Sequence, residues 1–251
     1  MPNKQKREDH GMEYGLQMYS VRDITGEDLA GALQQVAQLG YRFVEFAGFF
    51  GHSAEEVKQM LDAYGLRVSG THTGWQELTA DRIDETIAYH KTIGNKNIII
   101  PGADLSTREK LDALIALINE AQPKLEAAGI ALGYHNHSHE FIETAYGAYI
   151  HKELEEKTNV EFEIDTYWAY VAKEDPVATL ERLKHRMRVI HLKDGMQDGH
   201  GMALGEGTAP VVAVRQKAIE LGLAMVVESE TCKPTGIEEV GRCIRFLQGL
   251  E

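Results

Sequence analysis

The sequence predicts a single closed (β/α)8 barrel, because eight short apolar runs alternate with longer amphipathic segments along nearly the whole chain. The runs are rich in β-branched and aromatic residues, and they end roughly every thirty residues, which is the size of one strand–helix unit. The turn after the first run, Ser20–Asp23, lacks the glycines that an open, doubly wound nucleotide-binding sheet usually carries there. The expected strands are residues 14–20, 41–47, 67–73, 97–103, 130–137, 160–168, 187–194 and 224–230.

The segments between these runs carry helix-boundary signals. Ser53 opens a capping box with the glutamate three residues later, which predicts a helix over residues 54–64, and Gly65 ends it. Ser106 opens a second capping box, and Pro123 is expected to kink or split the helix that follows. Further helices are expected at residues 27–39, 146–157 and 236–247, and from Asp175 and Thr208 onward.

Composition narrows the class of protein. The 251 residues include 26 basic and 39 acidic side chains, a net charge of −13, which disfavours binding to nucleic acid or to an anionic membrane surface. The longest apolar runs are far shorter than the ~20 residues of a membrane helix. Two cysteines make no disulfide framework. We therefore expect a cytoplasmic protein with a disordered leader over residues 1–11 and one barrel domain over residues 12–251.

Polar side chains gather at the carboxyl ends of the expected strands, where barrels of this type build their active sites. A carboxylate or imidazole at the end of a buried strand needs a partner, since such groups are rarely buried alone. Imidazoles and carboxylates on four consecutive strands suit a divalent metal such as Mn, Co, Zn, Mg or Fe. The notable side chains at or just after the strand ends are Gln17, Glu45, His72, Trp75, His135, His137, Glu140, Asp165, Trp168, His191, Lys193 and Glu228.

Three further features each allow two interpretations. Trp75 and Trp168 fit either sugar-stacking platforms or packing at the barrel rim. Gly205-Glu206-Gly207 precedes a helix, and such a loop either holds a phosphate or simply leads into the helix.

With these residues in place, the chain resembles the sugar phosphate isomerase/epimerase superfamily of xylose isomerase-like TIM barrels. The resemblance extends over residues 15–250. It rests on GLQMYSVRD (15–23), GYRFVEFAGFFG (40–51), GTHTGW (70–75), LGYHNHSHEF (132–141), EIDTYW (163–168), IHLKDG (190–195), LGEG (204–207) and VVESE (226–230).

The resemblance implies one divalent metal ion held by a Glu, an Asp, a His and a second Glu from strands 5 to 8. The last three correspond to Asp165, His191 and Glu228. The first Glu position holds His135, so we assign that role to Glu140, with His135 or His137 as the alternatives.

Two differences between this sequence and the family pattern argue against particular branches of the family. Relatives often place a His three residues after the Asp, where this chain has Trp168, and this argues against ordinary ketose epimerisation. The acidic charge and Trp168 also argue against the DNA-repair branch, which needs three zinc ions.

The resemblance implies an isomerase or epimerase that abstracts a proton beside the carbonyl of a keto sugar or sugar phosphate. Its expected ligands are the divalent metal and a small sugar, and it is expected to form a homodimer. The catalytic candidates are Glu228, His135, His137 and Glu140, and the substrate-binding candidates are His72, Lys193, Trp168, Trp75, Gln17 and Glu45. Two alternatives stay open. One is a metal-dependent lyase or dehydratase on 3-keto-glycosides or inososes, and the other is a sugar-binding barrel without turnover.

Overall fold

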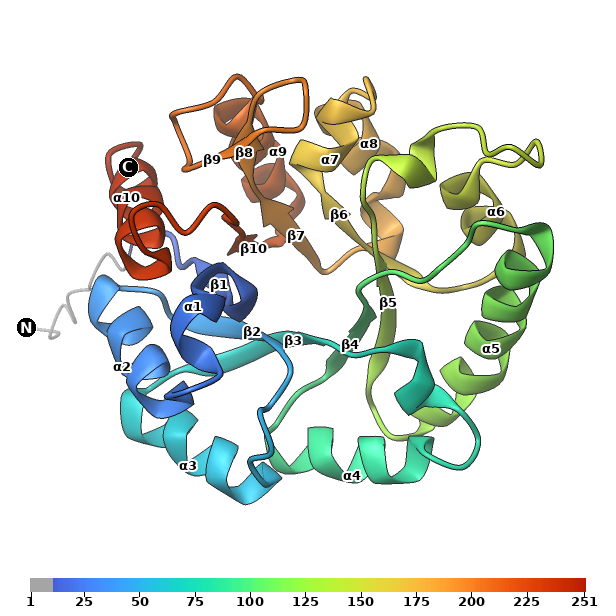
Figure 1. Cartoon of the computed structure of the whole chain (residues 1–251), viewed down its shortest axis with the longest axis horizontal. Coiled ribbons are helices and arrows are strands. Elements are labelled where there is room, and N and C mark those ends of the chain that lie inside the picture. The colour runs from blue at the N-terminus through green and yellow to red at the C-terminus, as the bar shows by residue number, and fades with distance from the viewer. Residues whose placement is uncertain (1–10) are drawn as a thin grey trace, which may run out of the picture.

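Eight parallel strands close into one barrel in the order β1-β10-β7-β6-β5-β4-β3-β2, which confirms the predicted fold class (Figure 1). The structure is a computed structural model and describes residues 11–251, so the predicted leader lies outside the described residues except for Gly11. The strands are β1 (Gly15–Gln17), β2 (Phe43–Ala47), β3 (Arg67–His72), β4 (Asn97–Ile100), β5 (Ala131–His135), β6 (Glu161–Asp165), β7 (Val189–Leu192) and β10 (Ala224–Val227).

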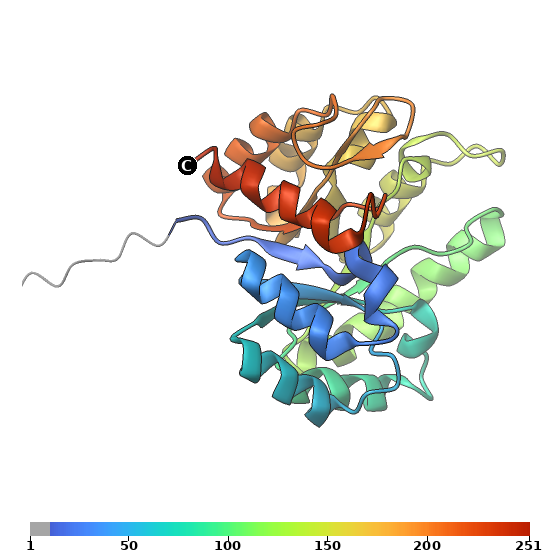
Figure 2. The same ribbon diagram turned by 60° about the vertical axis from the view of Figure 1, so that its left-hand side comes forward.

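Helices surround the barrel, as Figure 2 shows from a second side. The main ones are α2 (Leu29–Leu39), α3 (Ala54–Tyr64), α4 (Ile83–Thr92), α5 (Arg108–Ala127), α6 (Ile150–Lys157), α8 (Pro176–Leu183), α9 (Val211–Leu221) and α10 (Gly236–Gln248). Two short helices, α1 (Arg22–Thr25) and α7 (Thr166–Val171), follow β1 and β6 directly, and a small hairpin of β8 (Asp194–Gly195) and β9 (Gly201–Met202) follows β7.

The predicted helix boundaries are confirmed at α3 and displaced at α5. The Ser53 capping box forms, and Gly65 ends α3 in the left-handed conformation at φ 67°. At α5 the N-cap is Thr107 instead of Ser106, because the Asp104 side chain accepts the Ser106 N–H at 3.1 Å and holds that residue in the preceding turn. Pro123 does not split α5, whose apolar face stays buried against the barrel on both sides of it.

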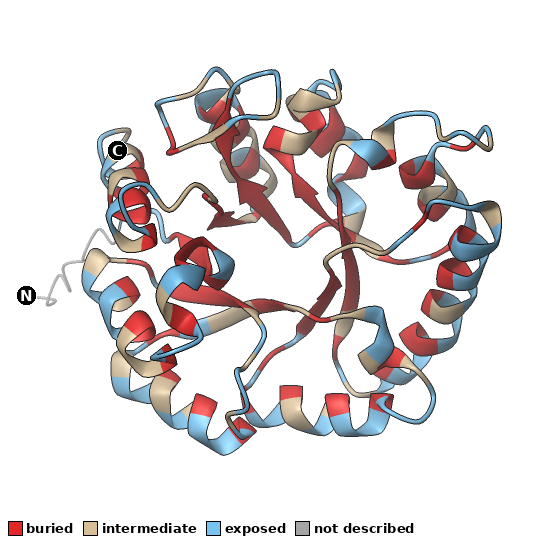
Figure 3. Ribbon diagram, viewed as in Figure 1, coloured by how far each residue is buried: buried red, intermediate tan, exposed pale blue. Residues whose placement is uncertain are grey.

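The barrel interior changes from apolar to polar along the strands. Phe43, Val189 and Val226 form part of a buried cluster at the amino-terminal end of the barrel. Each lies two residues before a polar residue of the same strand or its end, and residues two apart share one face of a strand. The apolar cluster therefore lies directly beneath the polar site, and Figure 3 shows that the strands around it are buried. Among residues 11–251, no helix is long and apolar enough to cross a bilayer.

Candidate metal centre

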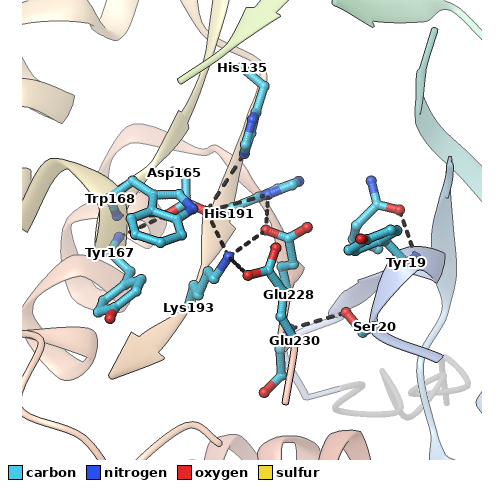
Figure 4. A network of polar contacts seen from close by, with 12 residues as sticks. Tyr19, Ser20, His135, Asp165, Tyr167, Trp168, His191, Lys193, Glu228 and Glu230 are labelled. Carbon is cyan, nitrogen blue, oxygen red and sulfur yellow. Dashed lines mark hydrogen bonds and ion pairs between the residues drawn. The ribbon is translucent and has the colours of Figure 1, made fainter. Parts of the chain in front are cut away.

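Four buried side chains from neighbouring strands converge at the carboxyl end of the barrel (Figure 4). They are His135, Asp165, His191 and Glu228, which we call the ligand set. His135 Nε2 lies 3.6 Å from Asp165 Oδ2, and His191 Nδ1 lies 3.8 Å from the same oxygen. Glu228 Oε2 lies 3.3 Å from His191 Nδ1. All four side chains are almost fully buried.

The ligand set suits a divalent ion. Both ring nitrogens of His135, Asp165 Oδ2 and His191 Nδ1 are buried, and none has a hydrogen-bond partner among residues 11–251. One ligand atom from each of the four residues lies within 4.8 Å of the others. Metal–ligand bonds of about 2.0–2.2 Å place ligand atoms roughly 3–4 Å apart, so this spacing closes around an ion with little movement. Burial lowers the pKa of His135 despite Asp165 nearby, which keeps its imidazole neutral and able to bind a metal.

Asp165 is held with one oxygen free. Its Oδ1 accepts the backbone N–H groups of Tyr167 at 3.0 Å and Trp168 at 2.9 Å, and this cap begins α7. The strand expected over residues 160–168 therefore ends at Asp165, and Trp168 lies in a helix instead of a strand. Its Oδ2 turns toward His135 and His191 because Oδ1 is engaged.

Lys193 places a buried ammonium group beside the ligand set. Its Nζ lies 2.9 Å from Glu230, 3.1 Å from Glu228 and 3.9 Å from Asp165. It also lies 4.8 Å from the centre of the Trp168 ring, a cation–π distance. Burial opposes its charge, but the carboxylates prevail and raise the pKa of Lys193. Likewise, burial opposes ionisation of Glu228, yet Lys193 and His191 lower the pKa of that carboxyl far below its usual range.

A second group of polar side chains packs against the other side of His191. It consists of Gln17, Glu45, His72 and Glu163, which we call the inner polar set. Gln17 and Glu45 are completely buried, and Gln17 Nε2 donates to Glu45 Oε1 at 2.6 Å. His72 Nε2 lies 2.8 Å from Glu163 Oε2 and 3.2 Å from Glu45 Oε1. Of the four, His72 retains the most exposure, at 10% of its side chain.

The two carboxyl groups of the inner polar set titrate very differently. Burial, followed by the charge of Glu45, raises the pKa of Glu163 well above its usual range. Burial also opposes ionisation of Glu45, but His72 and His191 outweigh it and lower the pKa to about 2. Burial and the repulsion between the two carboxyl groups thus raise the pKa of Glu163, while the neighbouring imidazoles lower that of Glu45.

Sequence reasoning missed Glu163. Its signal was present, because Glu163 lies two residues before Asp165 and so shares its inward face. Its partner Glu45 belongs to a strand on another side of the barrel, and only closure of the barrel brings them together.

The turn after β5 holds a separate group. Glu140 is fully buried, accepts the Tyr134 hydroxyl at 3.1 Å and accepts the backbone N–H of His137 at 2.8 Å. His137 and His139 lie 3.8 and 3.4 Å from Glu140 Oε1. The structure thus groups Glu140 with these two histidines. His135 lies with Asp165, His191 and Glu228 in the ligand set, and its ring also lies in a second group of ligand-type atoms with His72, Glu163 and His191.

Two other candidate features lie apart from the ligand set. Trp75 is 38% exposed and lines a cavity of about 430 Å³ with Leu114 and Leu117 of α5. The N–H groups of Gly205 and Gly207 both donate to Asp194 Oδ2, at 2.9 and 3.1 Å. The loop considered as a phosphate site is therefore occupied by a carboxylate of the protein itself.

The comparisons with known proteins agree with this architecture. The family of xylose isomerase-like TIM barrels matches residues 33–248, and the chain belongs to this family. A crystal structure of a sugar phosphate isomerase/epimerase from Parabacteroides distasonis ATCC 8503 is 26% identical, with a TM-score of 0.79. That match covers 99% of this chain and 98% of the other.

More distant relatives extend the range of activities. An inosose dehydratase from Geobacillus kaustophilus (strain HTA426) is 24% identical over 190 residues, which are 66% of this chain and 62% of that enzyme's length. An L-ribulose 3-epimerase shares the fold, with a TM-score of 0.70 at 14% identity and 94% coverage of each chain. Relatives of this barrel thus include both isomerases or epimerases and a dehydratase.

Proposed function

We propose that the protein is a divalent-metal-dependent isomerase or epimerase that moves a proton beside the carbonyl of a keto sugar. One observation carries the proposal: four ligand-type side chains converge from neighbouring strands, and His135, Asp165 and His191 keep buried ligand atoms without a partner among the described residues. We assign the ion to the ligand set, with His135 in the position first given to Glu140.

The proposed proton transfer depends on the charges around the ligand set. A bound divalent ion would supply Lewis acidity to the substrate carbonyl and would offset the negative charge that develops when a neighbouring proton leaves. Lys193 adds a second fixed positive charge, because its Nζ is held between Glu228 and Glu230. Preorganised charge of this kind is the largest contribution in many enzymes.

Glu228 and His137 are the groups we assign to proton transfer. Glu228 lies at the end of β10 with one oxygen directed at His191 and Lys193, and it stays ionised, as a base must. His137 is 40% exposed, and its buried Nδ1 has no hydrogen-bond partner within residues 11–251. The Glu140 side chain raises the pKa of His137 against the effect of burial, which favours a role as proton donor. Glu140 itself we assign to holding this turn.

Trp168 and His72 are the proposed contacts to the sugar. Trp168 stacks over the Lys193 ammonium, and its buried Nε1–H has no acceptor within the described part of the chain. A sugar hydroxyl would satisfy that donor while the ring covers the apolar face of the sugar. His72 supplies an imidazole at the edge of the inner polar set.

Hydrogen exchange into unphosphorylated ketoses tests the proposal. The protein, loaded with Mn²⁺ or Zn²⁺, is incubated with a panel of ketoses in D2O, and the proton beside the carbonyl is followed by NMR. We expect exchange or epimer formation that a chelator abolishes and that Glu228→Gln slows by roughly 10²–10⁴-fold. Metal binding without exchange on any keto sugar would favour the non-catalytic sugar-binding alternative.

The lyase alternative keeps one supporting observation of its own. His137 and His139 both lie at the exposed turn after β5, where they are able to protonate a leaving group. The likeness to an inosose dehydratase points the same way. The same NMR experiment with inosose or a 3-keto-glycoside distinguishes a lyase from an isomerase. A lyase would give an unsaturated product in place of an exchanged ketose.

We also propose, from its two free cysteines, that the protein acts in the cytoplasm on small molecules. The net charge of −13 supports the proposal that it binds no nucleic acid. Light scattering would test the homodimer that the family resemblance implies.

A further inference from the structure

We propose that Glu45 is a positioning residue for the metal centre, holding the His191 ring so that Nδ1 faces the ligand set. This inference rests on the proposed function, because it concerns the same site, and it assigns Glu45 a role other than the substrate contact expected from the sequence. Glu45 lies on β2, across the barrel interior from β7, and is completely buried.

A backbone hydrogen bond fixes the orientation of the Gln17 amide. The Tyr19 backbone N–H donates to Gln17 Oε1 at 3.0 Å, which fixes the amide oxygen on that side. The Gln17 amide nitrogen therefore points to Glu45 Oε1, at 2.6 Å. An oxygen that receives an amide N–H at this distance is an acceptor, so the Glu45 carboxylate is available to a second donor.

That second donor is His191. Its Nε2 lies 2.8 Å from Glu45 Oε1, a normal hydrogen-bond distance. Because Glu45 accepts here, Nε2 carries a proton, which leaves Nδ1 as the nitrogen that would bind a metal. Nδ1 is the atom that faces Asp165 Oδ2 and Glu228 Oε2, at 3.8 and 3.3 Å. A carboxylate that accepts the outer N–H of a metal-binding histidine fixes the tautomer and makes the ring a stronger ligand.

The geometry favours Glu45 over Glu163 for this role. Glu163 Oε2 is 3.2 Å from His191 Nε2 but 2.8 Å from His72 Nε2, so its shorter contact is with His72. The backbone also makes room for Glu45, since a Cβ on Gly70 would lie 3.0 Å from Glu45 Oε2. This glycine lets the carboxylate reach the centre of the barrel.

Metal affinity of the full-length protein tests the inference. The dissociation constants for Mn²⁺ and Zn²⁺ alone are measured by titration calorimetry for wild type, Glu45→Ala, Glu45→Gln and Glu163→Gln. We expect Glu45→Ala to weaken binding 10–100-fold. Glu45→Gln should weaken it less, because the amide oxygen is still able to accept the His191 N–H.

Glu155→Gln is the matched control. Glu155 also accepts from a buried histidine, with His151 Nδ1 at 2.8 Å, but that pair lies on α6. This variant should bind the metal like wild type. Thermal melts without metal identify any variant that fails to fold. If Glu45→Ala does not fold, the metal affinity of Glu45→Gln tests the inference in its place.

The outcomes separate this inference from the proposed function. Wild type that binds no divalent ion overturns both. Wild type that binds an ion while folded Glu45→Ala binds it equally tightly overturns only the role of Glu45. A loss confined to Glu163→Gln would likewise overturn it by moving the role to Glu163.

Discussion

Replacing Lys193 with Met should make the stability of the protein depend on bound metal. The change removes one buried positive charge that lies near Glu228, Glu230 and Asp165, and it keeps a side chain of similar length and shape. Without metal, these carboxylates then lose their ammonium partner in a site that water scarcely reaches. A divalent ion in the ligand set would restore positive charge in the same place.

The magnitude follows from the burial of Lys193, whose side chain is only 1% exposed. Removing one partner of a buried ion pair costs about 3–5 kcal/mol of unfolding free energy. For a chain of 251 residues, this lowers Tm by roughly 6–20 °C. Saturating Mn²⁺ or Zn²⁺ should recover at least half of that difference, so metal should raise the Tm of the variant more than that of wild type.

The assay is a thermal melt of wild type and Lys193→Met, each with chelator and with saturating metal. Lys58→Met serves as the control, because Lys58 pairs with Asp62 on the surface of α3 and such pairs contribute less than about 1 kcal/mol. The reasoning fails if the metal-free variant is as stable as wild type. It also fails if metal raises both Tm values equally, since the ammonium would then lie too far from the ion to matter.

Three further predictions concern the surroundings of the site. Burial lowers the pKa of His90 to about 4 from 6.5, so the unfolded chain binds its proton first and stability falls as pH drops below 6.5. Urea denaturation should show a loss of about 2 kcal/mol between pH 7 and pH 5 that is absent in His90→Gln. Asp194→Ala removes the acceptor of four backbone N–H groups and should destabilise the protein by at least about 3 kcal/mol, with faster proteolysis in the following loop. Trp168→Ala should raise KM for the sugar more than it lowers kcat, and an unchanged KM would remove Trp168 from the sugar contacts.

The sequence was sufficient for the fold because the barrel signal repeats. Eight alternations of strand and helix agree with one another, so the displaced cap at Ser106 or the early end of the sixth strand changes no strand order. These local errors arise where a side chain competes with the expected pattern. Asp165 is the clearest case, because its carboxylate caps α7 and turns Trp168 from a strand position into a helix.

The site was harder to predict because its partners are distant in the chain. Asp165, His191 and Glu228 could be named from their places at strand ends. Whether His135 or Glu140 completes the set depends on the turn after β5, where Glu140 is drawn to the Tyr134 hydroxyl and a backbone N–H. The alternation of residues along one strand does not indicate which side chains of the following turn hydrogen-bond to each other.

Metal content of the purified protein tests the central claim most directly. Plasma mass spectrometry is applied to wild type, to Asp165→Ala, His191→Ala and Glu228→Ala, and to the deciding pair His135→Ala and Glu140→Ala. We predict one divalent ion per chain in wild type, retained in Glu140→Ala and lost in the other four variants. Loss in Glu140→Ala with retention in His135→Ala would contradict the ligand set, and wild type that takes up no divalent ion even after reconstitution would contradict the metal-dependent mechanism as a whole.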